Sequence, residues 1–101
     1  VSLGSATSST VTWNVTAAKV AYVSVSGSCT IANPTNVPSN GGFYSLKVSY
    51  TGNSTLAWGT SYKFPSGTAP SVTGTSGTVD IFTFRCDGTN MFLVGQSNDV
   101  R

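Results

Sequence analysis

Apolar and polar residues alternate along most of the chain, and a period of two is that of a β-strand rather than of a helix. The clearest run covers residues 43–50, in which every second side chain is Tyr, Leu or Val and Ser or Lys stands between them. Shorter runs with the same period cover residues 11–15, 21–31 and 56–58. These segments are predicted to be strands with one buried face.

One segment, TVDIFTFRC at residues 78–86, is apolar on both faces. Val79 and Ile81 fall on one side, and Phe82 and Phe84 fall on the other. A strand that exposed one of these faces to water would be unusual. The pattern therefore predicts a central strand, or one whose outer face a neighbouring chain covers.

Turn-forming residues separate the strand-like runs at regular intervals. The clusters are residues 33–34, 38–42, 51–53, 65–67 and 74–77. Asp87, Gly88 and Asn90 belong to a further four-residue turn between two apolar runs, which predicts a hairpin. Six or seven short strands with such punctuation predict an all-β fold, a small antiparallel β-sandwich or jelly roll.

At 101 residues the chain has the length of one small domain. We expect the folded domain to span residues 11–95, with residues 1–10 as a linker or extended arm and residues 96–101 as a tail. A domain of this size has a thin margin of stability, so help from a partner chain is expected.

The segment YKFPSGTAPSVT, residues 62–73, is too irregular for a strand and too apolar for an ordinary solvated loop. Proline fixes φ and removes a backbone donor, so Pro65, Gly67 and Pro70 are predicted to shape a rigid loop that crosses one end of the fold. We expect this loop to hold parts of the protein together rather than to perform chemistry.

Charged side chains make up only 8% of the chain, and there is no Glu and no His. Asp80, Asp87 and Asp99 are the only carboxylate side chains, which leaves little for acid–base or nucleophilic catalysis. The five Lys and Arg residues are scattered singly, which favours neither nucleic acid nor a membrane surface. We therefore expect a protein that is not an enzyme, binds no cofactor and inserts into no membrane.

The aromatic side chains allow two interpretations. Trp58, Tyr62 and Phe64 flank the proline loop and are candidates for contact with a ligand, such as a sugar ring, or with another subunit. In small β-domains most Trp and Tyr residues instead anchor the core or an interface. Packing is the interpretation that we favour for all three.

The two cysteines, Cys29 and Cys86, are too few for a disulfide scaffold, and their spacing does not suit a metal site. A bridge between them would stabilise the fold by roughly 4 kcal/mol in the chain-entropy model. Two buried free thiols are the alternative, and the sequence leaves both open.

Four stretches together resemble a module common in bacteriophage virion proteins, especially in the C-terminal parts of tail fibres. They are IANPTN at residues 31–36, the glycine-led strand at residues 41–50, TLAWGTSYKFPSGTAP at residues 55–70 and VDIFTFRCDGTNMFLVG at residues 79–95. The likeness covers most of the chain, and its most specific phrases are GTAP and DGTN. The sequence departs from the pattern at Cys86, where an aromatic or small residue is expected.

The resemblance implies a non-enzymatic structural module on a virion surface, assembled in the host cytoplasm and working as a homotrimer. Two placements follow from it, a tail-fibre or receptor-binding module and a capsid decoration protein. The partners would be copies of the chain, other capsid or tail proteins, and a host surface glycan or receptor. The competing hypothesis is a carbohydrate-binding module that acts through exposed aromatic side chains.

Overall fold

The computed structural model describes residues 2–16, 19–39, 42–64, 67 and 72–99, and within them the fold is all-β, as the alternating pattern predicted. The strands are β1 (Ser2–Thr7), β2 (Thr10–Val11), β3 (Val20–Ile31), β4 (Phe43–Trp58), β5 (Tyr62–Lys63), β6 (Val79–Cys86) and β7 (Met91–Ser97). No helix in this described part of the chain is long and apolar enough to cross a membrane.

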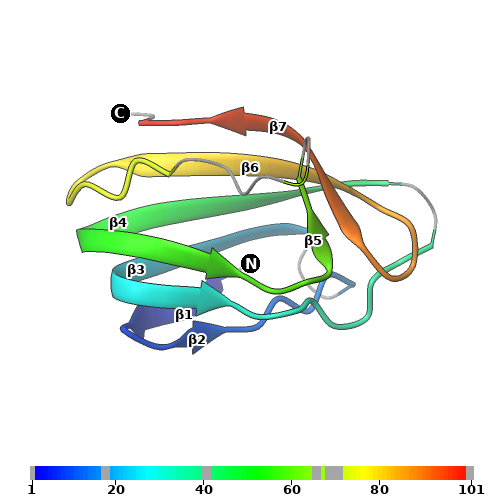
Figure 1. The fold of residues 1–101 in the computed structure, drawn as a ribbon, viewed down its shortest axis with the longest axis horizontal. Helices are drawn as coiled ribbons and strands as arrows, with labels where there is room; N and C mark the ends of the chain where they lie inside the picture. Colours follow the sequence, from blue (N-terminus) through cyan, green and yellow to red (C-terminus); the bar gives the residue numbers. More distant parts are fainter. Residues whose placement is uncertain (1, 17–18, 40–41, 65–66, 68–71, 100–101) are drawn as a thin grey trace.

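The strands form one mixed sheet in the order β1-β3-β4-β6-β7-β5, with β2 also paired to β3 (Figure 1). The pairs β4–β6 and β6–β7 are antiparallel, as predicted. The prediction of an antiparallel fold is wrong for the pairs β1–β3, β2–β3, β3–β4 and β5–β7, which are parallel. Alternation reveals which face of a strand is buried but not the direction of its neighbour, and the described residues between β3 and β4 form no helix that would mark a parallel crossover.

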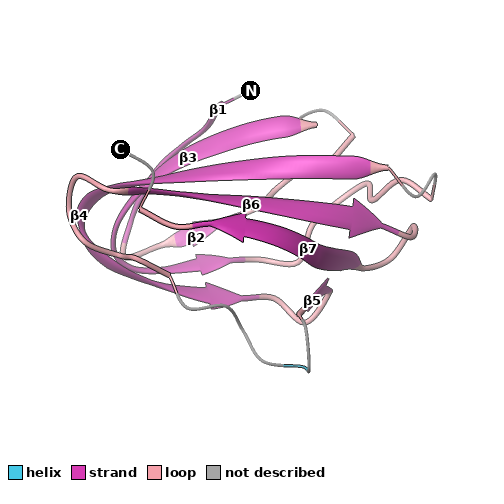
Figure 2. Ribbon diagram, turned by 90° about the horizontal axis from the view of Figure 1, so that it is seen from above, coloured by secondary structure: helices cyan, strands magenta, loops and turns pink. Residues whose placement is uncertain are grey.

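The two longest strands bend sharply in the middle, so the sheet curls over itself into a half-barrel (Figure 2). The turn predicted at residues 51–53 is wrong, because β4 runs through it. Val25 pairs with Tyr50 and Gly27 with Ser54, so three residues of β4 lie opposite Ser26 alone. This bulge lets β4 follow the outside of the bend in β3.

The bends of neighbouring strands are nested, and glycine makes the close approach possible. A Cβ atom on Gly27 would collide with the Ser8 hydroxyl, and one on Gly52 would collide with the Ser26 hydroxyl. Ser8 also donates its backbone N–H to the Ser26 carbonyl at 2.9 Å. Figure 1 shows β3 and β4 turning back at the same end of the molecule, one above the other.

The segment before β6 continues this column of bends. Ser54 donates its backbone N–H to the carbonyl of Gly74, and Gly77 donates to the carbonyl of Tyr50, both at 2.8 Å. A Cβ atom on Gly74 would collide with the Ser54 carbonyl oxygen. Small residues therefore lie where neighbouring bends meet.

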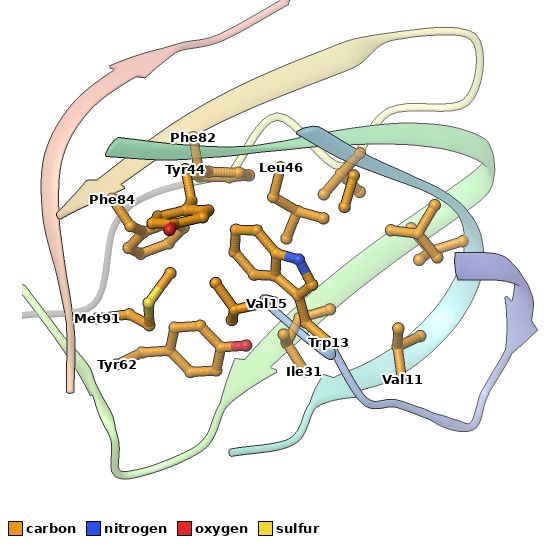
Figure 3. Close-up of a cluster of buried hydrophobic side chains, with 14 of the residues drawn as sticks. Val11, Trp13, Val15, Ile31, Tyr44, Leu46, Tyr62, Phe82, Phe84 and Met91 are labelled. Carbon is orange, nitrogen blue, oxygen red and sulfur yellow. The ribbon is translucent and has the colours of Figure 1, made fainter. Parts of the chain in front are cut away.

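The hydrophobic core fills the concave side of the curled sheet (Figure 3). Trp13, which follows β2, is fully buried and meets the Phe84 ring edge-on at 6.0 Å between centroids. The first ten residues, expected to be a linker or extended arm, contain β1 and the first residue of β2, and Ala6 of β1 is buried in the core. The two arms of the bent strands thus enclose one core without forming two separate sheets.

The nested bends predict a specific cost for a side chain at Gly74. Gly74 and Gly4 both have positive φ, at 68° and 87°, but a Cβ atom on Gly4 would meet nothing within 4 Å, whereas one on Gly74 would collide with the backbone oxygen of Ser54. Gly4→Ala should lower the free energy of unfolding by about 1 kcal/mol, from backbone conformation alone. Gly74→Ala should cost a further 1–3 kcal/mol, roughly the cost of overpacking, because a backbone oxygen cannot rotate away. Equal losses in urea denaturation would contradict the nested-bend account.

Candidate functional site

An aromatic cluster joins the end of β4 to β5 and β6, with Trp58 at its centre. The Trp58 ring lies 5.3 Å from that of Tyr62, 5.6 Å from Phe64, 5.2 Å from Phe82 and 6.0 Å from Phe84, between centroids. Most of these contacts are edge-to-face, an arrangement that adds to the stabilisation from burial alone. The start of the segment at residues 62–73 is therefore fixed to the core.

The structure brings the three predicted aromatic candidates together. Tyr62 is only 3% exposed and cannot serve as a stacking platform for a sugar, while Trp58 and Phe64 are half-buried against the core. Gly67 has a φ of 68° and donates its backbone N–H to the carbonyl of Phe64 at 2.9 Å. Pro65 and Pro70 lie outside the described residues.

Two buried polar atoms in this cluster have no hydrogen-bond partner, Trp58 Nε1 and Tyr62 Oη. Burial raises the pKa of Tyr62, so its hydroxyl is neutral. A buried donor without a partner costs roughly 1–3 kcal/mol in lost hydration. Ring packing therefore stabilises the cluster, and the two unsatisfied polar groups lower the stability of the folded state.

The main polar feature of the interior is Asp80, which is fully buried in β6. Its Oδ2 accepts from Tyr50 Oη and from the Thr73 backbone N–H, both at 2.7 Å. Its Oδ1 accepts from Thr73 Oγ1 at 2.5 Å and from the Asp99 backbone N–H at 2.9 Å. One carboxylate thus ties β4, β6, the segment before β6 and the chain after β7 to one another.

These bonds keep the Asp80 carboxyl charged. Burial alone would raise its pKa, but the donors from Thr73, Asp99 and Tyr50 outweigh it and the net pKa is lowered. Burial, together with the same carboxylate, raises the pKa of Tyr50 well beyond its usual range. This role of Asp80 is not predicted from the sequence, although a carboxylate between Val79 and Ile81 in an apolar strand is typical of a buried charge whose hydrogen bonds are satisfied.

The other candidate residues also hold the fold together. Asp87 begins the turn between β6 and β7, and its Oδ1 accepts from the backbone N–H groups of Thr89 at 3.0 Å and Asn90 at 2.7 Å, which lowers its pKa. Gly88 in the same turn has a φ of 96°. Cys29 and Cys86 are buried free thiols. Among the described residues, no three Asp, Glu, His or Cys side chains gather into a possible metal site.

The outer face of the β3-β4-β6-β7 part of the sheet is unusually apolar, and sequence reasoning identified only its β6 portion. Its exposed large hydrophobic side chains are Val20 (63% exposed), Tyr22 (48%), Phe43 (58%), Phe92 (39%) and Val94 (54%). Val79 and Ile81 of β6 are half-buried between them, opposite the buried Phe82 and Phe84. The predicted two-sided apolar character of β6 is confirmed, and β6 is an inner strand of the sheet.

Two cationic side chains, those of Lys47 and Arg85, occupy outward positions on the strands of this face. Lys47 pairs with Tyr22 on one side and Ile81 on the other, and Arg85 pairs with Phe43 and Phe92. The face carries no carboxylate at these strand positions. It is therefore apolar and weakly cationic.

Two of the surface hollows differ in chemical character. One of about 480 Å³ lies at the end of the outer face and is lined by Ser39, Arg85, Cys86, Asp87, Phe92 and Val94. The other, of about 560 Å³, lies along the column of bends and is lined by uncharged small residues that include Gly27, Asn53, Thr55 and Gly74. The first combines apolar walls with one charge of each sign, whereas the second is neutral and polar.

No family model, no curated protein and no solved structure matches this chain.

The two buried tyrosines predict opposite effects of the same substitution. Tyr50→Phe removes a donor to Asp80 and should lower the free energy of unfolding by about 1.5–3 kcal/mol, whereas Tyr62→Phe removes a hydroxyl without a partner and should raise it by about 1 kcal/mol. Denaturant titrations of both variants check this. A destabilised Tyr62→Phe protein would show that the hydroxyl does make a hydrogen bond.

Asp80→Asn should lower the free energy of unfolding at pH 7 by about 2–4 kcal/mol, because an amide N–H₂ would face two donors and the charge is lost. Since its pKa is lowered in the folded state, the contribution of Asp80 is complete above the ordinary pKa of about 4 and is lost as pH falls through the lowered value. Thermal melts from pH 7 to pH 2 should fall more steeply for the wild type than for Asp80→Asn. Parallel curves would contradict this role, and Asp87→Asn in the exposed turn is the control.

Proposed function

We propose that this chain is a non-enzymatic structural module of a bacteriophage virion surface that assembles with copies of itself as a trimer. The observation that carries the proposal is the exposed apolar outer face of strands β3, β4, β6 and β7. The virion setting rests on the sequence resemblance to tail-fibre modules. The resemblance also implies a sandwich or jelly roll, and the curled sheet shares with these folds a core enclosed by facing layers.

The composition of the outer face favours contact with protein. Protein interfaces are enriched in aromatic residues and Arg and depleted in Asp, Glu, Lys and Ser. This face matches the pattern in its aromatic residues, in Arg85 and in having no carboxylate at its strand positions, and departs from it at Lys47 and Ser45. The five exposed large side chains are spread over β3, β4 and β7, with Ser45, Lys47 and Arg85 among the residues paired between them. An interface on this face would therefore combine apolar and polar contacts.

The positions of the carboxylates support a role without catalysis. Both oxygens of Asp80 are occupied by four donors from within the protein. Asp87 caps its own turn, and the backbone of Asp99 is one of the donors to Asp80. The carboxylates of Asp80 and Asp87 thus each have a structural use that accounts for their positions.

Both placements on a virion suit this geometry. In a tail-fibre or receptor-binding module, the end of the molecule that carries the β6–β7 turn would face the host, and a surface glycan or receptor would bind there. In a capsid decoration protein, the same end would contact the lattice. A free-standing carbohydrate-binding module is less favoured, because Tyr62 is buried and Trp58 is occupied by ring contacts on several sides.

Sedimentation equilibrium of the isolated chain over a wide range of protein concentrations tests self-assembly. We expect a mass three times that of the 10.4 kDa chain, and assembly that weakens when Phe92→Asp places a carboxylate on the outer face. A monomer at every concentration would contradict the proposal. Glycan-array binding that Trp58→Ala abolishes without unfolding the protein would instead support the carbohydrate-binding module.

A further inference from the structure

We propose that acid opens the Asp80 junction, by which we mean the Asp80 carboxylate with its donors from Tyr50, Thr73 and Asp99. When Asp80 takes up a proton, residues 72–73 and the chain after β7 leave it together, while the sheet stays folded. The inference goes beyond the proposed function and does not depend on self-assembly. It rests on the hydrogen bonds around the carboxylate and on the backbone on either side of it.

Two segments that are far apart in the sequence are bound to the same two oxygen atoms. Thr73 donates its backbone N–H to Asp80 Oδ2 at 2.7 Å and its hydroxyl to Oδ1 at 2.5 Å. The backbone N–H of Asp99 donates to the same Oδ1 at 2.9 Å. Neither segment can leave a charged Asp80 without depriving a buried carboxylate of its donors, which is costly. The charge therefore holds both segments in place.

Protonation of Asp80 changes what the junction can bind. A carboxylate accepts hydrogen bonds at both oxygens, whereas a neutral carboxyl group carries an O–H that is itself a donor. The hydroxyl groups of Tyr50 and Thr73 can turn to accept this proton, but the backbone N–H groups of Thr73 and Asp99 can only donate. Bonds from these N–H groups also weaken when the acceptor loses its charge. The two backbone contacts are thus the ones that acid releases.

The opening ends at Gly74. The carbonyl of Gly74 accepts from the Ser54 backbone N–H, and Gly77 donates to the carbonyl of Tyr50, both at 2.8 Å. These bonds do not involve Asp80, so this part of the segment stays on β4 when the junction opens. Gly74 has a φ of 68°, and a glycine can change its backbone conformation with no side chain to obstruct it. It is therefore a suitable hinge.

The backbone at Asp99 favours release on the other side. Asp99 has a φ of 52°, in the left-handed region that costs residues other than glycine conformational energy. Its bond to Asp80 helps to hold this conformation. Once the bond is lost, the backbone at Asp99 is free to relax.

Few other ionisable groups lie on the elements packed against Asp80. They are Tyr50 on β4 and Asp99 itself, while β7 and residues 72–78 carry none and Arg85 of β6 points to the opposite face. Burial and the carboxylate raise the pKa of Tyr50, so it stays neutral in acid. Burial opposes the ionisation of Asp80, but its hydrogen bonds outweigh burial and lower its pKa. The junction is therefore closed at neutral pH and opens as the pH falls through that lowered value, below about 4.

Amide hydrogen exchange at pH 7, measured residue by residue by NMR, tests whether the two segments open together. Thr73→Val keeps the shape of the side chain but removes the hydroxyl bond to Asp80. It should speed exchange at position 73 and at Asp99 by the same factor, roughly 10- to 100-fold, since the lost bond is to a charged group. The amides of Ser54 and Gly77 should exchange as in the wild type, because they bond to backbone carbonyls beyond the hinge.

Thr78→Val is the matched control. It removes a buried hydroxyl of the same segment that bonds to the Thr75 carbonyl and not to Asp80, so exchange at Thr73 and Asp99 should not change. Faster exchange at position 73 alone in the Thr73→Val protein would overturn the inference. Equal acceleration at every amide would also overturn it, because the protein would then be unfolding globally. The proposed function stands in either case.

An NMR titration of the wild type from pH 7 to pH 2 tests the release by acid. The amide signals of Thr73 and Asp99 should move with one midpoint, that of the Asp80 carboxyl carbon, while the signals of Ser54 and Gly77 do not follow it. Asp99→Asn removes the other carboxyl group but keeps the backbone N–H, and it should retain this midpoint. Separate midpoints for the two amides, or loss of the shared step in Asp99→Asn, would contradict the proposal.

Discussion

The close stacking of bends in neighbouring strands is the constraint on which the rest of the structure depends. A sheet curls this tightly only if each bend can lie against the next without intervening side chains, and Gly27, Gly52 and Gly74 meet that condition against serine residues. The lengths of the strands follow from the same geometry, because β4 needs additional residues to pass around the bend in β3. The core is then enclosed by two arms of the same strands, without a second sheet.

Two interior features hold the curl closed, and they work by different physical means. The Asp80 carboxylate joins four parts of the chain through four hydrogen bonds. Because a buried charge is costly when a donor is missing, these bonds favour this one arrangement of the four segments. The aromatic cluster around Trp58 works by ring packing and tolerates unsatisfied polar atoms at Trp58 and Tyr62. Because both features lie inside, the entire outer face of β3, β4, β6 and β7 remains available for contacts with other molecules.

Much of the fold could be predicted from the sequence, because alternation reports directly on burial. The alternation at residues 43–50 matches the buried and exposed sides of β4, and the two apolar faces of β6 are both present. The parallel pairing of β3 with β4 could not be predicted, since either direction gives the same alternation. Gly52 and Asn53 were interpreted as a turn because a bulge in a bent strand uses the same residue types as a chain reversal.

The candidate site was less predictable for a related reason. The sequence indicates aromatic candidates near the proline segment, and in the structure these residues pack against the core. Phe43 and Phe92 carry no such signal in the sequence. A single exposed Phe is unremarkable until the pairing of the strands places it beside others. The central claim is that these scattered residues form one face that neighbouring copies bury. Hydroxyl-radical footprinting over a range of protein concentrations tests it most directly. Oxidation of Tyr22, Phe43 and Phe92 should fall together as the concentration rises while that of Trp58 stays constant, and oxidation of these three residues that does not change with concentration would contradict the account.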